Sequence, residues 1–294
     1  MFVGRWWAGS SVRHCDSYQS PDAGMMAAVT HVHSVPARVY PEPCETIASL
    51  SHPRLRPYVV GYAGFRSASG ASVRHRVLPL NLATMIIDFA GPSRLVTGPR
   101  GVSTVFEQTG WGHGVSIGLT PAGATALLGV PMRELVGGTA RLADFLGHRE
   151  VELAERLGEA PDWPTRFALL DEQLTARLAV DRRPDGLAVR AWWRLQQSPG
   201  RLRISTLADE LGVSRRNLEL AFQRQIGLSP GTVARIARFQ RAVHMLTRPT
   251  GLLRTAVDCG YADQPHFNRE IRAMAGLTPT ELCAFLQYRE LAPR

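Results

Sequence analysis

The chain between residues 205 and 279 contains the same pattern twice, and this internal repeat constrains the fold more than any other feature. GLSP at 227–230 recurs as GLTP at 276–279, at an offset of 49 that also pairs Leu218 with Phe267. Upstream of the turn the offset is 48, because the second copy carries one extra residue there. Each copy has the pattern of a short helix, a glycine-containing turn and a longer helix. The sequence therefore predicts two helix-turn-helix units.

Turn and cap residues place these predicted helices along the chain. Gly212 and Gly260 occupy the two turns, where a residue without a Cβ tolerates positive φ. Ser214 and Asp263 stand where an N-cap side chain accepts an orphan amide hydrogen bond. The predicted helices of this half span 188–200, 205–211, 215–225, 231–246, 252–259 and 264–275, and TPTE at 278–281 forms a capping box that begins the last one.

The longer helix of each unit supplies the candidate DNA-binding residues, because side chains near its N-terminal end can contact base edges. In the first unit they are Arg216, Asn217 and Glu219, with Arg215 and Arg224 better suited to phosphates. In the second unit they are Gln264, His266, Asn268, Arg269 and Arg272. Arg235, Arg238 and Arg241 share one face of the intervening helix, which lies over the DNA backbone or in solvent.

The charge is concentrated on the repeat half. The whole chain carries a net charge of +9, of which residues 187–294 carry +8, while residues 119–186 carry −3. All 34 basic side chains are arginine, whose planar guanidinium suits phosphates and guanine edges. We therefore expect the helical half to bind a polyanion, with double-stranded DNA as the partner.

The half before the repeat has a different pattern. Residues 1–45 are rich in Ser, Pro, Gly and His and predict a poorly ordered leader. Short apolar or alternating runs at 56–65, 74–91, 93–98 and 112–121 predict strands, and segments within 121–180 predict short helices, one of them at 140–147. Apolar positions from Phe167 to Leu178 face either this sheet or a second subunit.

Together these patterns predict an α+β chain in which a β-rich N-terminal domain with several helices precedes an all-α domain. The N-terminal domain spans 46–182, DRRPDG at 181–186 is the linker, and 187–294 holds two helix-turn-helix units joined by a linker helix. The four cysteines are scattered and form no zinc or disulfide framework. No run of 18 apolar residues and no secretory signal occurs, so we expect a cytoplasmic protein without a membrane span.

The second unit, GYADQPHFNREIRAMAGLTPTEL, resembles the AraC/XylS family of bacterial transcription regulators. The resemblance implies a seven-helix DNA-binding domain with one recognition helix in each of two adjacent major-groove segments. It also implies a variable N-terminal domain that binds a small-molecule effector, forms a homodimer, or both, and contact with RNA polymerase if the protein is an activator. The family's base-contacting positions fall on Arg216, Glu219, Leu220, Gln264, His266, Asn268 and Arg269, and Leu220 departs from an arginine that is common there.

The competing hypothesis is an enzyme or DNA-repair protein that uses the helical half only for targeting. His31 and His33 form an HxH pair, but they lie in the predicted leader, with no Glu at a fitting distance. GVSIG at 114–118 matches a nucleophile-elbow pattern around Ser116, although no helix follows the serine directly. Cys15 and Cys44 lack the residues that would activate a methyl-accepting thiol. We therefore expect no catalytic site, metal or cofactor.

Overall fold

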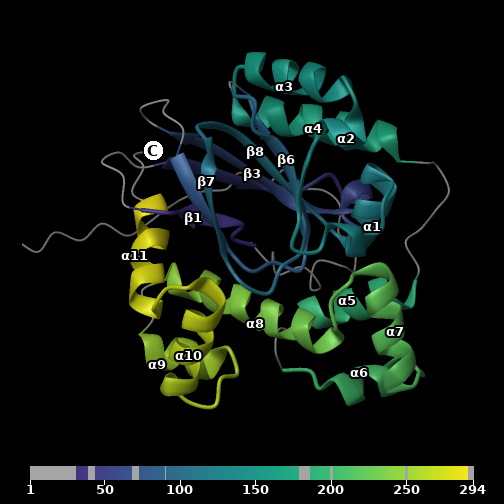
Figure 1. The fold of residues 1–294 in the computed structure, drawn as a ribbon, viewed down its shortest axis with the longest axis vertical. Helices are drawn as coiled ribbons and strands as arrows, with labels where there is room; N and C mark the ends of the chain where they lie inside the picture. The colour runs from purple at the N-terminus through teal and green to yellow at the C-terminus, as the bar shows by residue number, and fades with distance from the viewer. Residues whose placement is uncertain are drawn as a thin grey trace, which may run out of the picture.

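The computed structural model describes residues 31–38, 44–67, 73–89, 91–178, 186–198, 201–248 and 251–290. Strands occur up to residue 141, and from residue 187 onward every described element is a helix. Figure 1 shows the strands gathered in one body, with the helices α5 to α11 along one side of it. The predicted α+β fold class is therefore confirmed.

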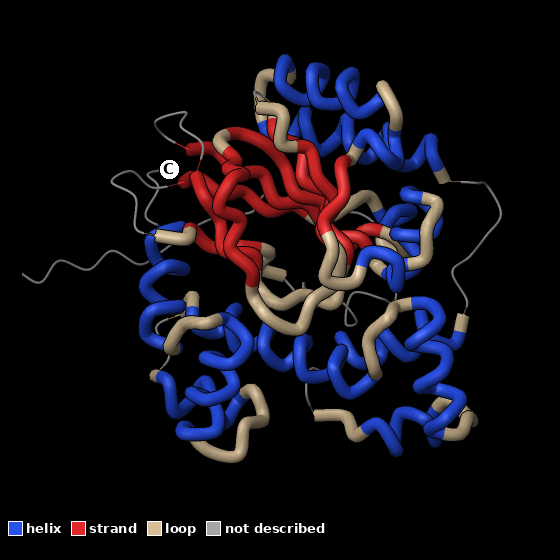
Figure 2. The backbone as a smooth tube through the Cα atoms, in the orientation of Figure 1, coloured by secondary structure: helices blue, strands red, loops and turns tan. Residues whose placement is uncertain are grey.

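Nine strands form two antiparallel sheets among the described residues (Figure 2). The smaller sheet has the order β1-β4-β7, and the larger has the order β2-β3-β8-β5-β6-β9. The strands are β1 (Ser34–Pro36), β2 (Cys44–Ser49), β3 (Val59–Ser67), β4 (Val73–Val77), β5 (Ala83–Asp88), β6 (Arg94–Thr97), β7 (Thr104–Trp111), β8 (His113–Leu119) and β9 (Thr139–Arg141).

Strand β5 lies in the middle of the larger sheet and is buried on both faces. Successive side chains of a strand point to opposite faces, so Met85 and Ile87 share one face and Ile86 takes the other. Met85 and Ile87 belong to the largest hydrophobic cluster, whereas Ile86 packs with Val77 and Trp111 of the smaller sheet. The continuous apolar run of β5 is thus explained by packing on both sides.

Helices cover the larger sheet on its outer side. They are α1 (Pro121–Gly123), a π-helical turn (Ala124–Leu128), a 3-10 turn (Met132–Leu135), α2 (Ala143–Leu146), α3 (Arg149–Glu159) and α4 (Trp163–Arg177). Phe167, Leu170 and Leu174 of α4 are buried within the chain's own core. The apolar face of α4 therefore packs inside the chain, which is the first of its two predicted roles. The helix predicted at 140–147 is wrong in its first half, because residues 139–141 pair with β6 as β9.

The predicted leader is too long. Residues 34–36 form β1, which pairs with β4, and β2 begins at Cys44. Val32 and Val35 are buried in a hydrophobic cluster whose other members come mainly from α8 to α11. The Pro- and Ser-rich composition concealed a strand that is stabilised by contacts with distant helices. Residues 1–30, 39–43 and most of the predicted linker lie outside the described residues.

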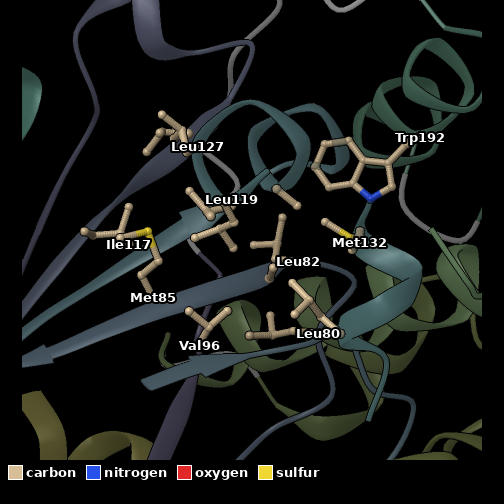
Figure 3. Packing of buried hydrophobic residues seen from close by; sticks show 14 of the residues in the cluster. Leu80, Leu82, Met85, Val96, Ile117, Leu119, Leu127, Met132 and Trp192 are labelled. Atoms are coloured by element: carbon tan, nitrogen blue, oxygen red, sulfur yellow. The ribbon is translucent and has the colours of Figure 1, made fainter. Parts of the chain in front are cut away.

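The C-terminal half consists of seven helices in its described residues, and it shares a core with the sheet. They are α5 (Leu187–Gln197), α6 (Ile204–Glu210), α7 (Arg215–Gln225), α8 (Pro230–Leu246), α9 (Leu252–Asp258), α10 (Gln264–Ala275) and α11 (Pro279–Glu290). Figure 3 shows Trp192 of α5 lying beside Met132 and Leu82 of the N-terminal half. Across the described residues, no helix has the length and apolar character needed to cross a membrane.

Candidate nucleic-acid interface

The first unit is built from α6, a tight turn and α7. Gly212 has φ of 66°, a conformation that side chains with a Cβ rarely adopt, so the chain turns there sharply. The Ser214 hydroxyl accepts a hydrogen bond from the Asn217 amide at 3.2 Å and caps α7. Leu218 and Phe222 are fully buried beneath the helix. The predicted turn and cap are therefore confirmed, and the N-terminal end of α7 is held rigidly.

The second unit has the same construction from α9, its turn and α10. Gly260 has φ of 77°, and the Asp263 carboxylate accepts a hydrogen bond from the His266 amide at 2.6 Å. Phe267 and Ile271 are fully buried, at the positions that the repeat pairs with Leu218 and Phe222. The internal repeat of the sequence is thus a repeat of structure, down to the burial of matching side chains.

The candidate DNA-binding side chains lie on the outer faces of α7 and α10. Nine of the eleven are exposed, namely Arg215, Arg216, Asn217, Glu219, Leu220, Arg224, Asn268, Arg269 and Arg272. Gln264 and His266 are half-buried. Because the opposite faces of both helices are buried in hydrophobic clusters, these residues form the surface that the two units present to solvent. Their contact with DNA stays a prediction.

Some of these candidate side chains already form hydrogen bonds or ion pairs within the chain, whereas others form none with the described side chains. Arg215 and Glu219 form an ion pair at 3.0 Å along α7, which occupies both groups in the absence of DNA. The His266 ring turns back toward its own turn, where Nδ1 accepts a hydrogen bond from the Ala262 amide at 3.3 Å. Arg216 and Arg269 are exposed, and neither forms a hydrogen bond or ion pair with another described side chain, which makes them the clearest candidates for base recognition.

The arginines of α8 have a role that the sequence analysis did not anticipate. Arg235 forms an ion pair with Glu270 of α10 at 2.7 Å, and the guanidinium of Arg238 stacks over the Tyr261 ring at 5.6 Å. Both contacts join the linker helix to the second unit. Arg235 is still exposed and Arg238 half-buried, so the expectation that this face lies over the DNA backbone or in solvent stays a prediction, to which these two contacts add a structural role. Because Arg235 and Glu270 are 35 positions apart, no local sequence pattern predicts the pair.

The Arg235–Glu270 pair predicts a pH dependence of stability. The hydrogen bond from Arg235 holds the pKa of Glu270 below its ordinary value. Because the pKa of Glu270 is lower in the folded state than its value of about 4.3 in the unfolded state, the ion pair stabilises the fold fully at pH values above about 4.3. This stabilisation is lost as the pH falls through the folded-state pKa. In urea denaturation at pH 7 we expect the free energy of unfolding of wild type to exceed that of Glu270→Gln by about 0.2–1 kcal/mol. This difference should shrink as the pH falls below about 4. When Arg235→Gln is already present, the additional effect of Glu270→Gln on the free energy of unfolding should depend little on pH. If that effect keeps the pH dependence it has in wild type, the Arg235–Glu270 pair is not its cause.

Comparison with known proteins matches the repeat half. The family model described as "Helix-turn-helix domain" matches residues 207–284. An HTH-type transcriptional regulator of Haemophilus influenzae is 31% identical over 117 residues, which make up 39% of this chain and 35% of the relative. The chain thus spans about a third of the length of the curated relative that it matches.

Two solved structures are similar to this chain, one over about a third of it and the other over most of its length. A transcriptional regulator from Chromobacterium violaceum, with an AraC-type DNA-binding domain, has 26% identity and a TM-score of 0.33, covering 34% of this chain and 92% of its own. ToxT from Vibrio cholerae has 12% identity and a TM-score of 0.46, covering 84% of this chain and 100% of its own. The family match and the relative show that residues 207–284 are an AraC-type helix-turn-helix domain, the DNA-binding domain of a class of transcription regulators.

Proposed function

We propose that this protein is a sequence-specific transcription regulator that inserts α7 and α10 into adjacent major-groove segments of double-stranded DNA. The observation that carries the proposal is the presence of two exposed helices with matching turns and caps. Helix α8 has 17 residues, or about 25 Å at 1.5 Å per residue, and it runs between the two units. One turn of B-DNA is about 34 Å, so α8 has a length suited to holding two helices near successive grooves.

The test is binding of the purified full chain to the intergenic DNA upstream of its own gene and to random DNA, across a salt series. We expect a strong preference for one site and a footprint that includes two neighbouring major-groove segments. Phosphate contacts should make both affinities fall with salt, because bound arginines release counterions from DNA. Equal and steeply salt-dependent binding to both DNAs would contradict sequence-specific regulation.

Arg269→Ala tests base recognition by α10. An arginine that makes a bidentate contact to a guanine contributes about 1–3 kcal/mol of discrimination, so we expect specific binding to weaken by that amount with little change on random DNA. Arg141→Ala is the control, because this residue is exposed, carries the same charge and lies on β9 in the N-terminal half. An equal loss on specific and random DNA would make Arg269 a phosphate contact instead.

The N-terminal domain supports the effector hypothesis through a cavity between its two sheets. Its volume is about 50 Å³, room for about one or two waters, so a metabolite would also occupy the adjoining hollow of about 290 Å³, which shares His31, His33, Ala63 and Ser116 with it. The described side chains that line the cavity include no Asp, Glu or Arg. The Trp111 indole N–H is buried there with no hydrogen-bond acceptor within reach among the described residues. We propose that a small uncharged molecule with a hydrogen-bond acceptor binds at this position.

The competing role of the N-terminal domain, dimerisation through the face from Phe167 to Leu178, is less well supported. Phe167, Leu170 and Leu174 are between 0% and 7% exposed in the single chain and are therefore already covered. Thermal denaturation with candidate metabolites distinguishes the two roles. A ligand present at 100 times its Kd adds about 2.7 kcal/mol to the free energy of unfolding, whereas a domain that only dimerises responds to protein concentration instead.

The enzyme alternative finds little support in the positions of its candidate residues. Ser116 lies inside strand β8, and its hydroxyl donates to the Ala63 carbonyl at 3.3 Å instead of standing at a strand-to-helix elbow. His31 and His33, expected in a disordered leader, lie beside the sheet and line the cavity. Of the two cysteines considered for a methyl-accepting thiol, Cys44 is the first residue of β2. Cys15 lies outside the described residues.

A further inference from the structure

The two recognition helices end in the same way, and both ends face the N-terminal half of the chain. Gly227 follows α7 with φ of 80°, and Gly276 follows α10 with φ of 68°. A Cβ on Gly227 would lie 2.6 Å from Val136 Cγ2 and 2.8 Å from Arg133 Cα. A Cβ on Gly276 would lie 3.1 Å from Arg76 Nη1. The glycines of the GLSP and GLTP repeats thus allow close approach of the N-terminal half.

Hydrogen bonds from the N-terminal half cap the end of α10. The Ser103 amide donates to the Met274 carbonyl at 2.7 Å, and the Ser103 hydroxyl donates to the Ala275 carbonyl at 2.7 Å. Arg76 Nη1 donates to the same Ala275 carbonyl at 3.3 Å. The last carbonyls of a helix have no partner within the helix, and a positive charge there also interacts favourably with the helix dipole.

The end of α7 has an equivalent contact. Arg133, in the 3-10 turn Met132–Leu135, donates from Nη1 to the Arg224 carbonyl. Arg133 therefore caps the C-terminal end of α7, as Arg76 and Ser103 cap the C-terminal end of α10. We call Arg76, Ser103 and Arg133 the clamp residues. They come from three separate segments of the N-terminal half, and each contacts main-chain atoms at the C-terminal end of a recognition helix.

The clamp residues belong to one continuous frame. The segment that leads to Ser103 is bonded to the segment that follows Arg133, because the Gly137 amide donates to the Pro99 carbonyl at 2.9 Å and the Gly98 amide to the Gly138 carbonyl at 3.1 Å. Strand β4, which carries Arg76, pairs with β7 immediately after Ser103. The end of α10 is thus attached to the smaller sheet and the end of α7 to the turn beside β6 and β9 of the larger sheet, and residues 98–103 connect the two attachments.

We propose that the clamp residues are positioning residues that set the orientation of α7 relative to α10, and so the spacing of the two DNA segments that one chain can bind. This inference rests on the proposed function. Along the helices, the contacted carbonyls of Arg224 and Ala275 lie about 12 Å from Arg216 and about 9 Å from Arg269, the candidate base-contacting arginines. The clamp residues bind main-chain carbonyls, so the side chains of Arg216 and Arg269 stay exposed.

The test uses the full chain and the DNA site that the footprint defines, together with probes in which the two contacted segments are moved apart by one or two base pairs. Each added base pair moves the second segment by about 3.4 Å and rotates it by about 35°. We expect wild type to bind the probe with two added base pairs at least tenfold more weakly. The variant R76Q/S103A/R133Q should bind the native site more weakly and lose less than threefold on the same insertion.

Arg141→Gln and Arg254→Gln are charge-matched controls for the two arginines, since both residues are exposed and lie outside the clamp. They should keep the wild-type spacing preference. If the triple variant does not fold, R133Q removes the contact at the end of α7 alone and R76Q/S103A removes the contacts at the end of α10 alone. Each of these variants should lose less affinity than wild type when base pairs are inserted between the two DNA segments. A folded clamp variant with the wild-type spacing profile would overturn the inference, whereas wild-type protein that cannot distinguish its site from random DNA would overturn the proposed function itself.

Discussion

Trp192→Ala should remove about 3–5 kcal/mol from the free energy of unfolding, as measured by urea denaturation. Trp192 is fully buried in the cluster that contains both the sheet and the first helix-turn-helix unit. Its indole N–H donates to the Asn81 carbonyl at 3.1 Å, and Asn81 is itself fully buried and donates to the Val233 carbonyl of α8. Truncation therefore opens a cavity and leaves a buried carbonyl without its donor at the same place.

The neighbouring residue provides a matched control. Trp193 packs edge-on against Trp192 with ring centroids 5.0 Å apart, but it is only half-buried. Trp193→Ala removes the same number of atoms from the same helix, and we expect it to lose less than half as much stability. Trp192→Phe keeps a ring and removes the N–H, which should lower stability by about 1–3 kcal/mol through the unsatisfied carbonyl. Equal losses for the two alanine variants would contradict the shared core between sheet and helices.

The repeat units could be predicted from sequence because their determinants are local. The glycines at the turns, the caps Ser214 and Asp263, and the buried apolar side chains all lie within about 15 residues of one another in each unit. The exposed faces of α7 and α10 follow directly from the same spacing. These features gave correct helix boundaries to within a residue or two, and they place the candidate DNA-binding residues on two exposed helix faces.

The parts that sequence did not predict depend on contacts between distant positions. Strand β1 lies in a Pro- and Ser-rich segment and is held by β4 and by helices more than 200 residues away. The clamp joins Arg76 and Ser103 to carbonyls of α10, and main-chain carbonyls carry no signal in a sequence. Arg235 has the local pattern of a solvated arginine and is exposed, but its ion pair with Glu270, 35 positions away, depends on the fold. A single sequence gives no means of finding such pairs.

Gln240→Leu should have the other large effect on stability, because it removes three buried hydrogen bonds at once. Gln240 of α8 is 1% exposed. Its Oε1 accepts from the Val32 amide at 2.9 Å, and its Nε2 donates to the Val32 carbonyl at 3.2 Å and the Pro79 carbonyl at 2.7 Å. Leucine has a similar size but no polar atom, so three main-chain groups lose their partner without a large cavity forming.

A buried group left without a hydrogen bond destabilises a protein by about 1–3 kcal/mol, and we expect the three losses to total about 3–5 kcal/mol because they share one site. Hydrogen exchange locates the effect, since the Val32 amide should exchange much faster in the variant while amides of α10 change less. Gln197→Leu is the control, because that side chain is exposed at the end of α5. If Gln240→Leu leaves stability and Val32 exchange unchanged, residues 31–36 are not attached to α8, and the cavity that His31 and His33 line would lose one of its walls.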